Sequence, residues 1–138
     1  MSDKSPLELL HAYHDAWEQG DVDKGVSFYA PDIVVHMGGA SPLAGEYRGR
    51  DEFVTQWIER VAQYTDSWIV RGNDILLVSD DGLVLMVHEY WSRGSRSVET
   101  DRLGIYLFKD NMISECWFSD MDQAAVDDFF SEIGPKST

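Results

Sequence analysis

The order of hydrophobic and polar residues changes character along the chain. Helical spacing dominates the first half, and strand-like runs dominate the second. Ser5 precedes Pro6 and stands three residues before Glu8, which predicts a helix that begins with a capping box. Gly20 is a typical stop for that helix. The residues that recur at helical intervals between these bounds are Leu7, Leu10, Tyr13, His14 and Trp17.

Two further helices are predicted before residue 65. Asp21 can cap a short helix that Pro31 ends. Three residues of this stretch are expected to face the core: Val22, Val26 and Tyr29. The run "DIVVHM" then reads as a strand, and a Gly-rich stretch crosses from it to a third helix that opens near Asp51. The apolar stripe of the third helix consists of Phe53, Val54, Trp57, Ile58, Val61 and Tyr64.

From about Trp68 onward the pattern is that of strands. Four runs, "SWIVRGNDILLVS", "GLVLMVHEYWSR", "SVETDRLGIYLFK" and "MISECWFS", are separated by turn signals. A last helix is expected over residues 123–132. Helices followed by an antiparallel meander predict an α+β fold, with helices laid on one face of a curved sheet, in one domain that spans residues 1–138.

Charge and cysteine content exclude several classes of function. The chain of 138 residues has 25 acidic and 11 basic residues, a net charge of -14, which disfavours nucleic acid and anionic membranes as partners. Cys116 is the only cysteine, so no intrachain disulfide can form. The start "MSDKSPLE" has no apolar signal region, and we therefore expect a cytoplasmic protein.

Alternation along residues 82–93 divides one strand into two faces. Leu85, Val87 and Trp91 share one face, and Met86, His88 and Tyr90 share the other. Both faces are too apolar for open solvent, which predicts a homodimer that packs through one sheet face. We expect Met86, His88 and Tyr90 to line the cavity, since the other three residues make the better apolar interface.

The stretches "YAPDIVVHMGGASPLAGEYRGRDEF" and "YWSRGSRSVETDRLGIYLFKDNMISECWFSDMDQAAVDDFF" resemble the nuclear transport factor 2 superfamily, in particular its SnoaL-like, ketosteroid-isomerase-related branch. The resemblance covers nearly the whole chain. It implies a cystatin-like conical barrel whose N-terminal helices pack on the concave face of a curved sheet, an interior pocket and usually a homodimer. Because this fold hosts isomerases, cyclases, hydrolases, dehydratases and binding modules, the site must decide the function.

The resemblance also implies candidate catalytic residues. Ketosteroid isomerases keep a catalytic carboxylate at the end of the strand where this chain has His36, which can substitute as a base. Tyr13 lies on the helix where these isomerases place an oxyanion-stabilising tyrosine, although its place in an apolar stripe favours packing as the explanation. Asp120 matches the acid/base aspartate of SnoaL-like cyclases. Asp120 with Gln123 also fits a helix cap, as does Asp122.

Arg102 is expected inside the cone. It shares a strand face with Thr100, Gly104 and Tyr106, and a buried guanidinium needs an acidic partner, for which Asp120 is the candidate. Epoxide hydrolases of the superfamily use an arginine bracketed by two acids to activate water, and the sequence shows only part of such a set. The predicted ligand-binding residues are Trp17, Trp57, Met86, His88, Tyr90, Arg102, Tyr106 and Trp117.

These residues favour an enzyme without a cofactor or bound metal. Acid/base chemistry on a small hydrophobic carbonyl compound, as in an isomerase or cyclase, is the leading hypothesis. A non-catalytic binder of an apolar ligand and an epoxide-hydrolase-like addition of water are the alternatives. No phosphate-binding glycine motif and no ligand-rich metal motif occurs in the sequence.

Overall fold

Six strands form one mixed sheet in the order β2-β1-β6-β5-β4-β3 in the computed structural model, which describes residues 4–136. β1 and β6 run parallel, and the other neighbours run antiparallel. The strands are β1 (Tyr29–Met37), β2 (Gly45–Arg48), β3 (Ser67–Val78), β4 (Gly82–Arg93), β5 (Arg96–Lys109) and β6 (Met112–Asp120). The predicted α+β class and the curved sheet are confirmed.

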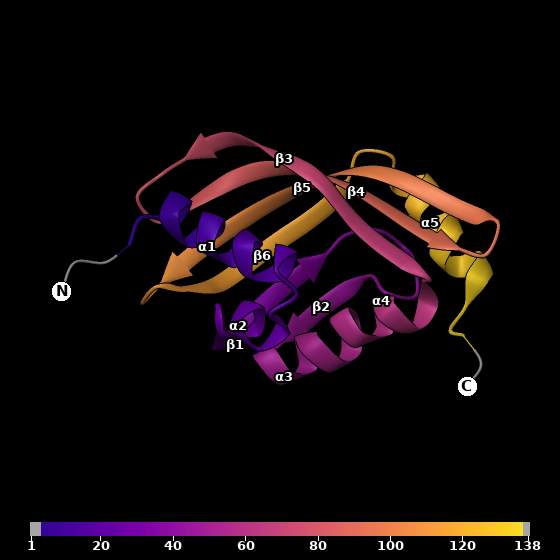
Figure 1. Ribbon diagram of the computed structural model, residues 1–138, viewed down its shortest axis with the longest axis horizontal. Coiled ribbons are helices and arrows are strands. Elements are labelled where there is room, and N and C mark those ends of the chain that lie inside the picture. The colour runs from indigo at the N-terminus through magenta and orange to yellow at the C-terminus, as the bar shows by residue number, and fades with distance from the viewer. Residues whose placement is uncertain (1–3, 137–138) are drawn as a thin grey trace.

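The helices gather on one face of this sheet and at one of its ends (Figure 1). They are α1 (Pro6–Glu18), α2 (Val22–Ser27), α3 (Arg50–Phe53), a π-helical segment η1 (Val54–Ile58), α4 (Glu59–Tyr64) and α5 (Gln123–Ile133). Their apolar residues meet the inner face of the sheet in a single core that includes Leu10, Val61, Val35 and Leu85. No helix among residues 4–136 is long and apolar enough to cross a lipid bilayer.

The start of the chain follows the predicted capping chemistry. The side chain of Ser5 accepts the backbone N–H of Glu8 at 3.2 Å, and the side chain of Glu8 accepts the backbone N–H of Ser5. Asp21 caps α2 through the N–H of Lys24. The expected core face of α2 is wrong in part, because Val22 is 53% exposed.

The end of α2 also differs from the prediction. The helix stops at Ser27, and Tyr29 already belongs to β1. Pro31 lies inside β1, between Tyr29 and Val34, where the pairing with β6 shifts register. Because the regular ladder is interrupted there, the missing N–H of proline costs no paired hydrogen bond.

The Gly-rich stretch contains a strand that the hydrophobic pattern does not reveal. β2 has only four residues and pairs antiparallel with β1, with Tyr47 opposite Val35. Tyr47 is its one buried side chain, so the strand presents a single apolar position. A single buried position cannot show the apolar–polar alternation that predicts a strand. The predicted third helix is present, but its middle winds as the π-helical segment η1.

Candidate functional site

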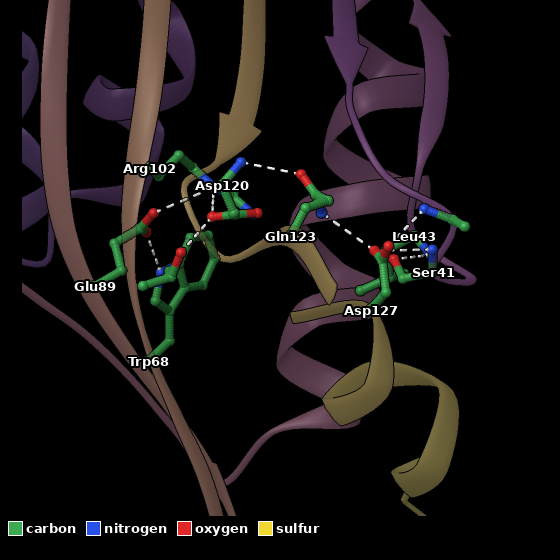
Figure 2. A network of polar contacts seen from close by, with 10 residues as sticks. Ser41, Leu43, Trp68, Glu89, Arg102, Asp120, Gln123 and Asp127 are labelled. Atoms are coloured by element: carbon green, nitrogen blue, oxygen red, sulfur yellow. Dashed lines mark hydrogen bonds and ion pairs between the residues drawn. The ribbon is translucent and has the colours of Figure 1, made fainter. Parts of the chain in front are cut away.

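Three neighbouring strands each bring a charged side chain to the inner face of the sheet (Figure 2). Glu89 comes from β4, Arg102 from β5 and Asp120 from β6. All three are buried, with exposed fractions of 6–7%. Alternation explains the shared direction, since Val87, Glu89 and Trp91 occupy one face of β4, and Thr100, Arg102 and Gly104 occupy the same face of β5.

Arg102 makes a bidentate ion pair with Asp120. Its Nε donates to Oδ1 and its Nη2 donates to Oδ2, both at 3.2 Å. The hydroxyl of Thr100 donates to the same Oδ1 at 2.6 Å. Charge-assisted pairs of this kind fix the orientation of both groups. The predicted partnership of Arg102 and Asp120 is therefore confirmed.

Glu89 is the second acid beside the guanidinium. Its Oε2 lies 3.6 Å from Nε of Arg102, and its Oε1 accepts the indole N–H of Trp68 at 2.7 Å. Burial raises the pKa of Glu89, although Arg102 and the Trp68 N–H oppose the rise. A buried carboxyl with a raised pKa is suited to hold and donate a proton.

Arg102 itself remains a cation in this setting. Burial lowers its pKa, but Glu89 and Asp120 outweigh that effect, and the net pKa lies above its ordinary value. Its guanidinium carbon also lies 4.8 Å from the ring centre of Trp91 and 5.5 Å from that of Trp57. Two carboxyl groups thus flank one fixed positive charge inside an aromatic shell.

A cavity of about 10 Å³ adjoins the ion pair. Its lining includes Arg102, Asp120, Trp57, Leu43, Gln123 and Val126. A space of this size has room for roughly one water molecule. Trp57, predicted as a ligand-binding residue, is thereby placed beside the ion pair.

The two helix-capping alternatives for the end of β6 are resolved. Asp122 caps α5 by accepting the N–H of Ala125 at 3.2 Å. The carboxylate of Asp120 points instead to Arg102, and only its backbone N–H joins the helix start, by donating to Oε1 of Gln123 at 3.0 Å. The carboxylate of Asp120 therefore takes no part in the helix cap.

His36 lies away from this cluster, on the outer face of the sheet. Val35 and Met37 take the inner positions of β1, so the intervening His36 faces outward. Its Nε2 lies 2.7 Å from Glu115, and its ring stacks on Trp117 at 5.0 Å between centres. His36 and Trp117 line an open hollow of about 440 Å³ on that face. His36, the candidate catalytic base, therefore lies on the opposite face of the sheet from the carboxylate of Asp120.

Met86, His88 and Tyr90 also lie on the outer face, so the expectation that they line the interior is wrong. His88 is held there between Asp101 and Asp74, at 2.6 and 2.9 Å. The predicted alternation itself is confirmed. The inner face goes to Leu85, Val87 and Trp91 because these large apolar side chains gain most from burial.

Tyr13, Tyr106 and Trp17 lie inside the fold near α1. The hydroxyls of Tyr13 and Tyr29 are 2.6 Å apart, and burial raises the pKa of Tyr13 well above its ordinary value. The rings of Tyr13 and Tyr106 are 6.3 Å apart, and Trp17 packs against Gly25 of α2. Tyr13 also packs edge-on against Phe28 and Tyr29, which fits the packing alternative considered for it.

The sequence model of the SnoaL-like domain family matches residues 10–116. The chain belongs to the SnoaL-like family. It is 31% identical over 97 residues to the uncharacterized protein Rv0034 of Mycobacterium tuberculosis, which covers 70% of this chain and 72% of that protein.

Solved structures share the fold of this SnoaL-like protein at low sequence identity. A protein of unknown function with a cystatin-like fold from Xanthomonas campestris aligns with a TM-score of 0.83 at 17% identity, over 94% of this chain and 100% of that one. A nuclear transport factor 2-like protein from Burkholderia xenovorans aligns with a TM-score of 0.75 at 15% identity, over 94% and 98%. The cystatin-like, nuclear transport factor 2-like fold is thus confirmed.

Glu89 is the site residue that sequence reasoning missed in this SnoaL-like protein. A signal was present, because Glu89 falls between Val87 and Trp91 on an otherwise apolar strand face. An acid in that position needs a buried cationic partner, and Arg102 was already expected inside.

Among residues 4–136, no three or more His, Cys, Asp or Glu side chains gather as a metal site would require.

Proposed function

We propose that this SnoaL-like protein is an acid/base enzyme that adds water to a small apolar epoxide. The observation that carries the proposal is Arg102 flanked by two buried carboxyl groups, Glu89 and Asp120, beside a cavity of one-water size. The resemblance supports it, because the epoxide hydrolases of the superfamily need an arginine bracketed by two acids.

The three residues have distinct roles in the proposed reaction. Asp120 accepts a proton from the water molecule as the water oxygen bonds to one epoxide carbon. The bond from that carbon to the ring oxygen breaks, and its electron pair moves to the oxygen. Glu89 donates its proton to that oxygen, which yields a vicinal diol. Arg102 holds both acids in place, and the proton on Asp120 returns to Glu89 through solvent.

A second candidate is proton transfer next to a carbonyl, as in an isomerase or cyclase. The observation that favours it is the position of Asp120 at the end of β6, which corresponds to the acid/base aspartate that the resemblance implies for SnoaL-like cyclases. Asp120 would remove a proton beside the carbonyl, and Arg102 would stabilise the enolate oxygen. This reaction consumes no water, which separates it from the first.

Isotope labelling distinguishes the candidates. Styrene oxide turned over in water labelled with heavy oxygen gives a labelled diol if water is added. A β,γ-unsaturated ketone in deuterated water gives a deuterated isomer if Asp120 moves a carbon-bound proton. In either case Asp120→Asn should lower kcat/KM by about 100-fold or more. Asp101→Asn removes an acid one residue from Arg102 but on the outer face, and serves as the matched control.

Binding of these probes without turnover would make the protein a binding module. Turnover that is unchanged in Asp120→Asn would contradict both enzymatic candidates. Stability of the Asp120→Asn variant is checked in parallel by urea unfolding, so that loss of activity is not mistaken for loss of fold.

We also propose that a second copy of the chain covers the outer face of the sheet. Support comes from the half-buried apolar side chains there, which include Met86, Leu103, Ile105 and Trp117. Sedimentation equilibrium tests this directly. A species of monomer mass at micromolar concentration would contradict it.

A further inference from the structure

The loop formed by residues 38–44 separates the ion-pair cavity from solvent. Gly38, Gly39 and Ala40 are exposed, whereas Leu43 on the same loop is 2% exposed and lines the cavity. Leu43 therefore fills space beside Arg102 and Asp120 that a substrate larger than water would need. Entry of such a substrate requires this loop to move.

One carboxylate on α5 holds the loop in place. Asp127 accepts the backbone N–H of Ala40 at 3.0 Å through Oδ2 and the backbone N–H of Ser41 at 3.1 Å through Oδ1. Gln123 donates to the same Oδ1 at 3.1 Å. Figure 2 shows these contacts as a chain that runs from Glu89 to the loop.

The contacts of Asp127 with Ala40 and Ser41 form a clamp on the loop. Gln123 links this clamp to Asp120, the proposed catalytic acid. Its Oε1 accepts the backbone N–H of Asp120, while its Nε2 donates to Asp127. Gly39 (φ 101°) packs so closely against α5 that a Cβ there would collide with Gln123 and Asp127. The loop and the start of α5 are thus fitted to each other, and one amide side chain contacts both Asp120 and the clamp.

The ends of the loop are bonded to other parts of the chain. The N–H of Leu43 donates to the hydroxyl of Ser41 within the loop, and the carbonyl of Leu43 accepts the hydroxyl of Tyr47. At the other end, the N–H of Gly38 donates to the carbonyl of Phe118 at 2.8 Å. These bonds anchor the two ends of the loop, whereas its middle is bonded to the helix through Asp127.

We infer that the 38–44 loop is the entrance to the Arg102–Asp120 site and that Asp127 controls its opening. The inference rests on the proposed function only in naming the site as the place of reaction. In Asp127→Asn one carboxylate oxygen becomes an NH2 group that cannot accept, so one loop amide loses its acceptor, the other keeps only an uncharged one, and Leu43 then leaves the cavity more often. Hydrogen bonds to a charged group are strong enough for their loss to shift such an opening equilibrium by about tenfold or more.

Thiol labelling tests the entrance without any assay of activity. Val126→Cys introduces a thiol of similar volume on the cavity wall, and the buried native Cys116 serves as an internal reference. In the Val126→Cys background, Asp127→Asn should raise the rate at which a neutral maleimide labels the introduced thiol about tenfold or more, and leave the rate at Cys116 unchanged. Asp128→Asn, the same charge change on the next residue along the helix, should change neither rate.

An unchanged labelling rate at the introduced thiol, or an equal rise at both thiols, would overturn the inference. If Val126→Cys does not fold, hydrogen exchange of the Leu43 amide, which bonds Ser41 and not Asp127, gives the decision in a variant with Asp127→Asn alone. Exchange should accelerate at the Leu43 amide and not at the core amides of β6. Failure of the proposed water addition would leave these measurements unaffected, so the two ideas fail separately.

Discussion

Arg102 and Asp120 stand directly opposite each other in the register of β5 and β6 and are joined by two hydrogen bonds. The sheet itself thus fixes their separation, and neither side chain depends on a loop for its position. Because both groups are buried, each charge is tolerated only while the opposite charge of its partner lies beside it. Stability should therefore respond sharply to any change that leaves one of them alone.

Arg102→Met is expected to destabilise the protein by about 3–5 kcal/mol, because two buried carboxyl groups lose their cation. Urea unfolding followed by circular dichroism measures this. Arg48→Met removes an exposed ion pair with Glu46 and should cost no more than about 1 kcal/mol. Equal losses in the two variants would show that the buried pair has no special weight.

Thr100→Val keeps the shape of the side chain but removes the hydroxyl that donates to Asp120 at 2.6 Å. We expect a loss of about 1–3 kcal/mol, since the carboxylate is buried and loses one of its three donors. Thr100→Ser retains the hydroxyl and should recover most of the loss. A serine variant as unstable as the valine variant would assign the effect to packing.

Glu89 should make stability depend on pH. Its folded pKa is raised by burial, so the contribution to stability is complete below its ordinary value of 4.5 and is lost as pH rises through the folded pKa. Glu89→Gln should therefore be more stable than the wild type at about pH 8, and the difference should vanish toward about pH 4. Glu99→Gln on the exposed outer face is the control.

His88 should produce a second pH dependence of stability. Hydrogen bonds to Asp101 and then Asp74 raise its pKa above 6.5. Its contribution is complete below pH 6.5 and is lost as pH rises through the raised pKa. His88→Gln should flatten the pH profile of the unfolding midpoint in this window. His11→Gln, at an exposed position of α1, should leave the profile unchanged.

Gly25→Ala should destabilise α2, although alanine is the better helix former. A Cβ at this position would lie 2.6 Å from Cε2 of Trp17, so the two helices would have to separate. We expect a cost of about 1–3 kcal/mol. Trp17→Phe removes the atoms that collide, and the double variant should show a favourable coupling energy in thermal unfolding. Additive losses would mean that Trp17 is not the obstacle.

Much of the fold was readable from local patterns because the responsible forces are local. The Ser5–Glu8 capping box, the Asp21 cap and the alternation of β4 each depend on neighbouring residues alone. β2 was missed because its pairing with β1, and not its own composition, makes it a strand. The sequence carries no comparable local mark for such a contact.

Only part of the site could be predicted from the sequence. Arg102 and Asp120 followed from the cost of an unpaired buried charge. Which face of β4 points inward could not be predicted, because alternation groups Met86, His88 and Tyr90 on one face without saying which way that face points. Glu89 decides the matter in the structure, since it must reach Arg102 from the same face that buries Trp91. The direction of His36 could not be predicted either, because it depends on which residues of β1 are buried.

The parallel pairing of β1 with β6 sets the order in which the chain can be completed. The contact between His36 and Glu115 spans 79 positions of sequence. During synthesis, β1 therefore has no partner along its β6 edge until residues 112–120 have been made. Contacts this distant slow folding, because a long loop must close before the strands meet. Asp120 comes at the end of that same strand. The Arg102–Asp120 pair can therefore form only after the whole of β6, the last strand of the sheet, has been synthesised.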